Sequence, residues 1–414
     1  MLDINYVREN TDEVKKKVAT KNFDAKLIDE VLELDEKRRK LISEIDELRA
    51  KRNEIAPHGK PTEAEANAGK EIKEKLQELE PQLQEVEEKY KELLFKIPNI
   101  PSDDSPIGKD ESFNKVIRKW GDPRKFDFKV RDHVEIGKIL GIIDTDTAAE
   151  VAGARFNYLK GDLVLLQNAL YQFVLSVLIE KGFTPIIPPL ILKAETMKKM
   201  ARHDPVDDRY YFKDDDAMLV GSAEHALGPM HMNQTLNEKD LPLRYFAYTP
   251  AFRREAGTYG KDTRGILRQH QFDKVEMESF TTPADGSKEQ ELFVGIQEHL
   301  MQTLKLPYQV IAISTGDMGT PDFRQIDIET WMPGQDKYRE TNTSDYVTDY
   351  QSRRLNTKVK TKDGNEFVHM NDATAFAMGR TLIAILENYQ NEDGSVNVPE
   401  VLQKWMGKKK ISKK

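Results

Sequence analysis

FRREAGTYGKDTRGILRQHQFDKVEMESF, residues 252–280, joins two strand-like segments through a connection that is rich in glycine. The residues up to Arg254 and those from about Ile266 to Phe280 are typical of strands. The glycines between them suit a long turn between antiparallel strands. We therefore predict a hairpin with a long loop.

The faces of this predicted hairpin carry groups that suit a nucleotide. On a strand of period two, Arg253 and Glu255 share a face, and so do Arg268, Phe272 and Glu276. An arginine can hold a phosphate through two charged hydrogen bonds, an aromatic ring can stack on a base, and a carboxylate can accept from an amine. The alternative is a salt-bridged hairpin with Phe272 in the core. The shared-face spacing of the whole set favours the nucleotide site.

The chain around the hairpin predicts an α+β body. Strand-like runs (FTPIIPPLIL, RYFAYTPAF, YQVIAIS and QIDIETWM) alternate with amphipathic helical stretches at 162–181 and 289–305. This alternation indicates a mixed sheet with helices around it.

The N-terminal part has a different periodicity, which predicts an antiparallel α-helical coiled-coil arm over about 27–96. Its first seam is Leu27, Val31, Leu34, Leu41, Ile45, Leu48 and Ile55, with Arg38 and Arg52 at the two missing heptad positions. A second seam runs over 72–93, and APHGKPTEAEA between the two indicates a turn. Pro81 is expected to kink the second helix or to remove a hydrogen bond there. Basic clusters KRRK and RAKR on the first helix suit RNA, but charge alone favours the alternative of solvated charge and interhelical pairing.

The proline- and serine-rich stretch FKIPNIPSDDSPIGKDES, residues 95–112, indicates a boundary. We predict an arm with its linker over 1–110, a catalytic domain over 111–407 and a lysine-rich tail over 408–414. The tail could contact RNA, but a solvated, disordered segment is the favoured interpretation.

Composition narrows the class of protein. The chain has 414 residues, no cysteine and a formal net charge of -8. The lack of cysteine excludes disulfides, thiolate metal sites and cysteine nucleophiles, and it favours a reducing cytoplasm. The net charge argues against a uniformly basic coat for nucleic acid. The longest apolar stretch is interrupted by polar residues and the N-terminus lacks a leader pattern, so we expect no membrane association.

The hairpin resembles the second signature motif of class II aminoacyl-tRNA synthetases, and EAGTYGKDTRGILRQHQFDKVE is similar to seryl-tRNA synthetases in particular. KGFTPIIPPLI (181–191) resembles the first motif, which in the family builds the dimer interface, and AFAMGRTLIAILENYQ (375–390) resembles the third. LVGSAEHALGPMH and YRETNTSDYVTDYQSRR resemble the segments that line the amino-acid and ATP pockets. The resemblance spans nearly the whole chain. It implies an antiparallel sheet with surrounding helices, a homodimer, and an arm that binds tRNA(Ser), with tRNA(Sec) as a further substrate.

The resemblance also implies the site. Arg253 and Arg380 would be the catalytic cations, with Arg253 on the α-phosphate and substrate carboxylate and Arg380 on the terminal phosphates. The implied ATP-binding residues are Arg253, Arg254, Glu255, Arg268, Gln269, Phe272, Glu340, Thr343 and Arg380, and Glu340 with Thr343 would hold Mg2+. The implied serine-binding residues are Ser222, Ala223, Glu224, Arg253, Glu276, Asp372 and Thr374. Ser222 and Glu224 would hold the ammonium, and Glu276 and Thr374 would surround the hydroxyl.

The chain departs from the family pattern at three of these positions. Ser222 replaces a threonine and Thr343 replaces a serine, and both changes keep a hydroxyl. Asp372 stands where the family has an asparagine, which adds a carboxyl to the serine pocket. The resemblance places Asp372 close to Glu224 and Glu276, so we expect either that serine binds an ionised Asp372 or that one carboxyl of the group holds a proton.

The expected activity is a serine–tRNA ligase that forms seryl-adenylate from ATP and transfers serine to tRNA. A scaffold that binds RNA on an inactive synthetase body would lack Arg253, Glu340 or Arg380, and all three are present. A ligase that loads a carrier protein would lack the long arm.

Overall fold

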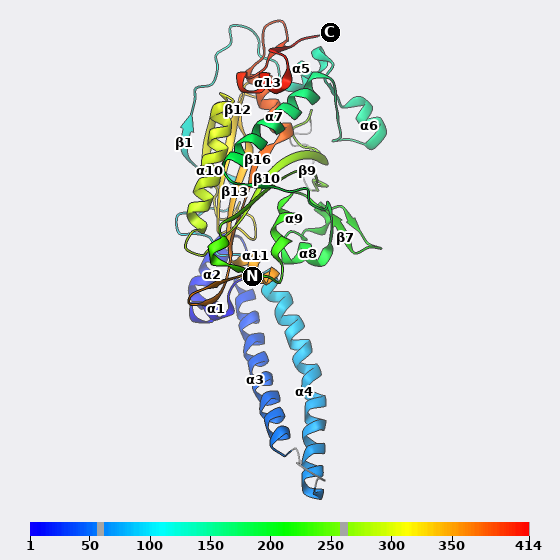
Figure 1. The fold of residues 1–414 in the computed structure, drawn as a ribbon, viewed down its shortest axis with the longest axis vertical. Coiled ribbons are helices and arrows are strands. Elements are labelled where there is room, and N and C mark those ends of the chain that lie inside the picture. Colours follow the sequence, from blue (N-terminus) through cyan, green and yellow to red (C-terminus); the bar gives the residue numbers. More distant parts are fainter. Residues whose placement is uncertain (56–61, 257–263, 414) are drawn as a thin grey trace. The chain divides into compact units, whose positions relative to one another are not determined.

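The computed structural model describes residues 1–55, 62–256 and 264–413, and these divide into two compact units, Met1–Ile100 and Pro101–Lys414 (Figure 1). The division between the units falls within the proline-rich stretch 95–112, ten residues before the predicted boundary after residue 110.

In the first unit, all regular secondary structure of the described residues is α-helical. Its two long helices are antiparallel: Arg38 Nε lies 3.0 Å from Glu87 Oε1, and farther along the arm Arg49 Nη2 lies 2.9 Å from Glu80 Oε1. Ile45, Leu48 and Leu76 form a buried cluster between them, as a coiled-coil seam requires. The helices are α1 (Ile4–Glu9), α2 (Thr11–Thr20), α3 (Lys26–Glu54) and α4 (Glu63–Lys96). The predicted antiparallel arm is confirmed.

The predicted seam is wrong at the base of the arm. Ile28 and Asp35 are buried there, whereas Leu27 and Leu34 are only partly buried. The face is rotated because the short helices α1 and α2 pack on α3 at this level, and Arg8 Nε lies 3.4 Å from the buried carboxylate of Asp35. A strict heptad describes the distal arm only, where each long helix has one partner.

The helix α4 continues through Pro81 without a break. Thr62 and Glu65 form a capping box at its start, in which the Glu65 amide donates to the Thr62 hydroxyl at 3.3 Å and the Thr62 amide donates to Glu65 Oε2 at 2.7 Å. Because Pro81 lacks only its own N–H donor, the remaining helical hydrogen bonds and the packing on α3 hold the helix together.

The second unit is built on an eight-stranded sheet in the order β1-β11-β12-β13-β16-β10-β9-β4. Its neighbours are antiparallel except for β4 and β9, which are parallel. The strands are β1 (Lys115–Trp120), β4 (Thr184–Pro185), β9 (Leu243–Phe252), β10 (Gln271–Thr281), β11 (Tyr308–Ala312), β12 (Arg324–Met332), β13 (Lys337–Thr348) and β16 (His369–Ala377). The predicted α+β body with an antiparallel sheet is confirmed.

Three helices, α7 (Asp162–Glu180), α10 (Gly286–Thr303) and α12 (Met378–Asn388), supply the main apolar core together with one face of this sheet. Val275, Met277, Ala373 and Ala375 point into that core. Among the described residues, α7 alone has the length and apolarity that could cross a membrane, with a mean hydropathy of 1.6. Its buried face belongs to the main core of the body.

The opposite face of the same strands is polar. Since side chains alternate along a strand, Glu276 and Glu278 lie on the side away from the core, and so does Asp372. Asp372 pairs in register with Glu278 on one side and with Asp345 on the other. Like charges directly opposite each other destabilise a sheet, so this row must be stabilised by other groups.

The remaining elements are short and surround the sheet. The helices are α5 (His133–Leu140), α6 (Asp146–Ala152), α8 (Ala194–Lys199), α9 (Glu224–Leu227), α11 (Tyr350–Leu355) and α13 (Gln403–Met406). The strands are β2 (Ile143–Asp144), β3 (Tyr158–Leu159), β5 (Ile191–Lys193), β6 (Tyr211–Phe212), β7 (Ala217–Leu219), β8 (Thr235–Asn237), β14 (Lys358–Thr361), β15 (Gly364–Phe367), β17 (Val396–Asn397) and β18 (Lys410–Ile411).

The hairpin strands are shorter than predicted. β9 ends at Phe252 and β10 begins at Gln271, so Arg253, Glu255 and Arg268 lie outside the strands. The alternation of side chains along a strand therefore does not explain how these three residues come together. Residues 257–263 of the predicted loop lie outside the described residues.

The C-terminal tail is also ordered, contrary to the prediction of a solvated, disordered segment. β18 pairs with β17, and Ile411 is buried in the main core. Lys408 Nζ lies 2.6 Å from Asp162 Oδ1, and Lys410 Nζ lies 3.1 Å from Asp393 Oδ2. The strand pairing, the two ion pairs and the burial of Ile411 together dock the segment.

Candidate active site

A cavity of about 340 Å³ opens on the polar face of the sheet. Strands β10, β13 and β16 supply its floor, and α9, α12 and the segment 266–269 contribute to its walls. Most residues implied by the resemblance line it: Glu224, Arg253, Glu255, Arg268, Gln269, Phe272, Glu276, Glu340, Thr343, Asp372, Thr374 and Arg380.

Three of the implied residues do not line the cavity. Ser222 and Ala223 are buried behind its wall, and Arg254 lies beside Arg253 on the chain without facing the cavity. Ser222 still contacts a lining residue, because Lys274 Nζ donates to its hydroxyl at 3.1 Å. The roles implied for Ala223 and Arg254 stay predictions.

One end of the cavity carries the aromatic ring and an arginine pair. Arg253 Nε donates to the carbonyl of Gly221 at 3.1 Å, and its guanidinium carbon lies 5.3 Å from the centre of the Phe272 ring. Arg268 Nη1 lies 2.9 Å from Glu255 Oε2. This ion pair links the segment that follows β9 to the segment that precedes β10. This end offers a ring face and two guanidinium groups, which suit a base and a phosphate.

A second cationic group stands at the start of α12. Arg380 Nη1 lies 2.8 Å from Glu340 Oε1, a carboxylate on β13 whose side chain is 48% exposed. Partial burial would raise the pKa of Glu340, but the charges of Arg380 and Arg253 outweigh this and lower it overall. The first turn of a helix also carries the positive end of its macrodipole. An ionised Glu340 and the Thr343 hydroxyl supply oxygen atoms of the kind that hard divalent cations bind.

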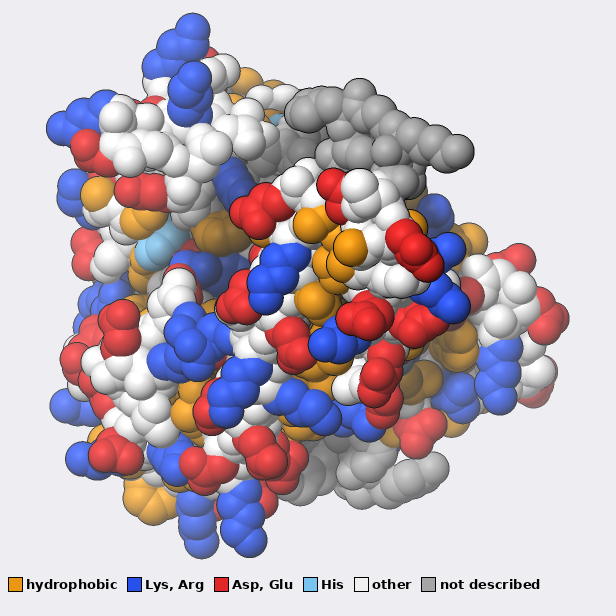
Figure 2. Space-filling view, turned by 90° about the horizontal axis from the view of Figure 1, so that it is seen from below, with side chains coloured by type: hydrophobic (Ala, Val, Ile, Leu, Met, Phe, Trp, Pro, Cys, Tyr) orange, Lys and Arg blue, Asp and Glu red, His pale blue; other side chains and the backbone are white. Residues whose placement is uncertain are grey.

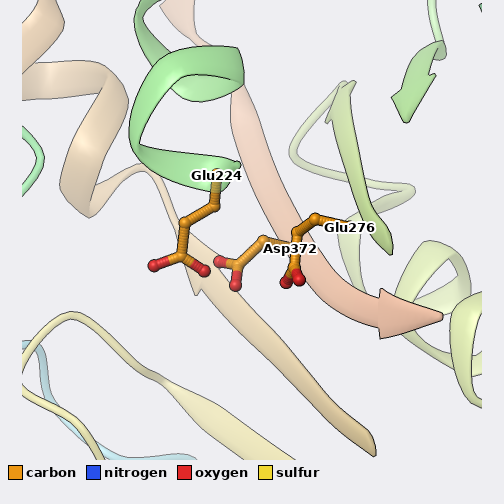
Figure 3. A group of neighbouring side chains, drawn as sticks. All are labelled: Glu224, Glu276 and Asp372. Carbon is orange, nitrogen blue, oxygen red and sulfur yellow. The ribbon is translucent and has the colours of Figure 1, made fainter. Parts of the chain in front are cut away.

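At the other end of the cavity three carboxyl groups converge. Glu224 comes from α9, Glu276 from β10 and Asp372 from β16, and each offers an oxygen within 4.8 Å of the other two (Figure 3). All three side chains are buried. The predicted proximity of Asp372 to Glu224 and Glu276 is confirmed.

Two cations that the sequence analysis missed balance part of this charge. Arg202 Nε lies 2.7 Å from Glu224 Oε1, and Lys274 Nζ lies 2.6 Å from Glu276 Oε2. Lys274 is two residues before Glu276 on a strand, so the alternation rule could have placed it on this face. Arg202 follows α8 in a segment with no recognisable motif, and no signal in the sequence points to it.

The three carboxyl groups differ in charge. Burial would raise the pKa of Glu224, but the charge of Arg202 and a hydrogen bond from His225 hold it well below its usual range. Burial raises the pKa of Glu276 to about 7. The charge of Lys274 opposes this rise, and repulsion from Glu224 adds to it. Burial and the charges of Glu224 and Asp345 raise the pKa of Asp372 well above its usual range. Burial and the nearby charges therefore favour the protonated form of Asp372, beside a Glu224 that is ionised near neutral pH.

This pocket is built for a small cationic and hydroxylated group. An ionised carboxylate accepts from an ammonium, and Thr374 adds a hydroxyl at the cavity wall. Thr374 lies opposite Glu276 in the sheet register, so the two can face one ligand group. The chemistry of one end of the cavity thus suits an anion, and that of the other end suits an ammonium group.

Comparison with known proteins gives the family. Residues 1–101 match the seryl-tRNA synthetase N-terminal domain, and residues 210–389 match the tRNA synthetase class II core domain (G, H, P, S and T). The chain is 42% identical to serine–tRNA ligase of Pseudothermotoga lettingae over 98% of this chain and 99% of that protein. It is 38% identical to the ligase of Nitrosopumilus maritimus over 99% of this chain and 100% of that protein.

The structure agrees with these sequence relationships. The crystal structure of seryl-tRNA synthetase from Pyrococcus horikoshii complexed with ATP aligns with a TM-score of 0.95 at 39% identity, and all of both chains is covered. The cytoplasmic serine–tRNA ligase of Naegleria fowleri in complex with AMP aligns with a TM-score of 0.91 at 33% identity, over 100% of this chain and 99% of that one. The chain belongs to the seryl-tRNA synthetase family.

Proposed function

We propose that this chain activates L-serine with ATP, releases pyrophosphate, and transfers serine from seryl-adenylate to a ribose hydroxyl at the 3' end of tRNA(Ser), with AMP as the leaving group. The observation that carries the proposal is the single cavity in which Arg253 and Arg380 lie with the carboxyl groups of Glu224, Glu276 and Asp372. The two arginines suit the phosphates of ATP, and the carboxyl group of Glu224 suits the ammonium of an amino acid. Family membership supports the same reaction.

In the first step a carboxylate oxygen of serine attacks the α-phosphorus of ATP, and the bond to the β-phosphate bridging oxygen breaks. Phe272 stacks on adenine, Glu255 accepts from its amino group, and Arg253 binds the α-phosphate together with the serine carboxylate. Arg380 binds the leaving phosphates. Placing the reactants and meeting the charge that develops on phosphate supply most of the rate, so no side-chain nucleophile is needed.

Mg2+ fits the end of the cavity at Glu340 and Thr343. Both supply oxygen atoms from β13, and the bulge at Thr341 brings these two residues, three positions apart, to the same face. The pKa of Glu340 is lowered, so its carboxylate is ionised near neutral pH. When bound, the ion would neutralise charge on the phosphates. Arg254, Gln269 and Arg268 complete the proposed ATP-binding set.

In the serine pocket, Glu224 binds the ammonium with Ser222 and Ala223 behind it, and Glu276 and Thr374 surround the hydroxyl. A pocket that hydrogen-bonds a hydroxyl rejects alanine, because alanine would leave buried polar groups without a partner. Serine can bind with its ammonium at the negative end of the cavity and its carboxylate toward Arg253.

The helical arm is the proposed tRNA(Ser)-binding element, and tRNA(Sec) is a further proposed substrate. On the face shown in Figure 2, Lys and Arg side chains are interspersed with Asp and Glu side chains. On such a surface, local clusters of basic side chains would contact phosphate. Arg49, Lys51 and Arg52 near the end of α3 are exposed and form one such cluster.

We also propose a homodimer in the cytoplasm. Ile187 is 99% exposed and Ile191 58% exposed, both in or beside the segment that resembles the first family motif, and Ile179 at the end of α7 is 52% exposed. Exposed isoleucines that gather in one segment are typical of an interface between copies of a chain. The cysteine-free composition suits a reducing compartment.

Exchange of labelled pyrophosphate into ATP tests the activation step. We expect exchange that depends on serine, requires Mg2+ and needs no tRNA, because all the proposed groups for activation lie in the second unit. Each of the other nineteen amino acids serves as a control. Full exchange in the presence of a chelator, or a preference for another amino acid, would refute the proposal.

Asp372→Asn is expected to retain serine activation. Since the raised pKa of Asp372 favours its protonated form, an amide of the same shape can donate to Glu224 in its place, and the affinity for serine should change by no more than about tenfold, roughly 1.4 kcal/mol. The measurement is the KM for serine in the exchange assay at pH 7. Complete loss of activation would assign Asp372 a direct part in the chemistry.

The KM for serine is expected to fall as the pH rises through about 7, which is the raised pKa of Glu276. An ammonium held by Glu224 lies near Glu276 and favours its ionised form, so serine binding must release a proton below that pH. The expected change is up to about tenfold per pH unit below the pKa. Measuring KM for serine and for ATP from pH 5.5 to 8.5 checks this, and a flat serine profile would contradict it.

A further inference from the structure

One wall of the cavity, residues 266–269, follows directly after Gly265 and lies outside the sheet. This wall includes Arg268 and Gln269 of the proposed ATP-binding set. Arg268 pairs with Glu255, but the start of the wall needs a different anchor, because no strand holds it. That anchor lies on α5.

His133, the first residue of α5, contacts the start of the wall. The Ile266 amide donates to His133 Nε2 at 3.4 Å, and both residues are buried. Gly265 has φ +66, and a Cβ atom on it would lie 2.1 Å from His133 Nε2. The imidazole therefore lies directly against the backbone of Gly265, at a distance that only glycine permits.

The ring of His133 is held in one tautomer. Because the Ile266 N–H can only donate, Nε2 accepts and the proton lies on Nδ1. Nδ1 lies 3.1 Å from Glu387 Oε1, and the His133 amide donates to the same oxygen at 3.0 Å. The second oxygen of Glu387 accepts from the Gly334 amide at 2.9 Å. The fully buried Glu387 thus fixes both the ring and the start of α5.

Glu387 and the phosphate-binding Arg380 belong to the same helix. At the start of α12, Gly379 also touches the wall, since a Cβ atom there would lie 3.1 Å from the Ile266 carbonyl oxygen. Ile266 is therefore held from both sides, by Gly379 at its carbonyl and by His133 at its amide. The helix that carries Arg380 also sets the position of the opposite wall.

We infer that His133, oriented by Glu387, is a positioning residue for the nucleotide: it holds the wall 266–269 so that Arg268 and Gln269 meet ATP. The inference rests on the proposed function. The inference predicts an effect on ATP binding and not on serine binding. Among the residues that the structure describes, His133 forms no hydrogen bond with Glu224, Glu276 or Asp372 of the serine pocket.

Two substitutions of His133 form a matched pair. In His133→Gln the side-chain amide reaches the place of Nε2 and can accept from Ile266. In His133→Asn the shorter amide reaches only the place of Nδ1, so the bond to Glu387 can persist while the Ile266 amide loses its acceptor. Each variant therefore keeps one of the two hydrogen bonds of the imidazole ring and loses the other. Comparable melting temperatures would show that the two variants are folded equally well.

The readout is the KM for ATP and for serine in pyrophosphate exchange by the full chain. We expect His133→Asn to raise the KM for ATP about tenfold, because a buried donor is left unpaired, and to change the KM for serine by less than about twofold. His133→Gln should stay within about threefold of the unsubstituted chain for both substrates. Gly265→Ala, whose methyl group would collide with Nε2, should raise the KM for ATP even if His133→Asn fails to fold.

An unchanged KM for ATP in His133→Asn, or equal increases for ATP and serine in both His133 variants, would overturn the inference. So would an unchanged KM for ATP in Gly265→Ala. A lack of serine-dependent exchange by the unsubstituted chain would instead refute the proposed function.

Discussion

Arg253→Met is expected to reduce serine-dependent pyrophosphate exchange by about 10²- to 10³-fold, the loss typical for one oriented donor to transition-state charge. Arg253 is the one group assigned to both reactants, because it is proposed to bind the α-phosphate and the serine carboxylate together. Its guanidinium is already oriented by the Gly221 carbonyl at 3.1 Å and by the Phe272 ring. The methionine keeps most of the volume and the contact with the ring, so the change removes charge and donors with little loss of packing.

The measurement is kcat/KM for exchange, with the melting temperature as a check on folding. Arg353→Met is the matched control: Arg353 on α11 also lies over a phenylalanine ring, at 4.7 Å from Phe367, and pairs with Asp349 at 2.7 Å, but it does not line the cavity. The control should retain activity. A loss of less than about fivefold in a folded Arg253→Met variant would remove Arg253 from the proposed chemistry.

Shortening the arm is expected to abolish charging of tRNA(Ser) while serine activation continues. Replacing residues 46–82 by a short glycine-rich turn removes the distal parts of α3 and α4, including the cluster at 49–52, and leaves α1 and α2 packed on the base of α3. The ion pair between Arg38 and Glu87 lies below the cut. None of the groups proposed for activation is removed, so the exchange rate should stay within about twofold.

The loss of charging should exceed about 10²-fold, because phosphate contacts dominate the affinity of proteins for nucleic acid. Initial rates of aminoacylation at several salt concentrations measure it, and charging by the intact chain should weaken steeply as salt rises. A matched control replaces Glu71, Glu74 and Glu78 on the acidic helix by glutamine and should not reduce charging. Normal charging by the shortened chain would show that the distal arm does not bind tRNA.

Regular periodicity in the sequence predicted the large elements well. The distal coiled coil and the helices at α7 and α10 follow from apolar residues at helical spacing, and short runs rich in aromatic and aliphatic residues predicted β9, β11 and β12. Where an element has one partner and one buried face, local pattern and tertiary packing agree. At the base of the arm α3 has additional partners, and there the buried positions shift to Ile28 and Asp35.

The site residues that belong to a sequence motif could be predicted. The residues that reach the site only through the packing of distant segments could not. Glu276, Asp372 and Thr374 lie on strands whose register brings them to one face. Arg202 reaches Glu224 from a short irregular segment after α8, and His133 reaches Ile266 from another helix. Such contacts depend on how distant segments pack, which local spacing does not encode.

The central claim, that this chain attaches serine to tRNA, is tested most directly by identifying the amino acid that it esterifies. The full chain would be incubated with ATP, Mg2+, total tRNA and an equimolar mixture of the twenty amino acids, and the ester at the 3' end would be released and identified by mass spectrometry. We predict serine alone, confined to tRNA(Ser) and tRNA(Sec), and no ester when ATP is omitted. Another amino acid, or no ester on any tRNA from a chain that binds ATP, would contradict the account.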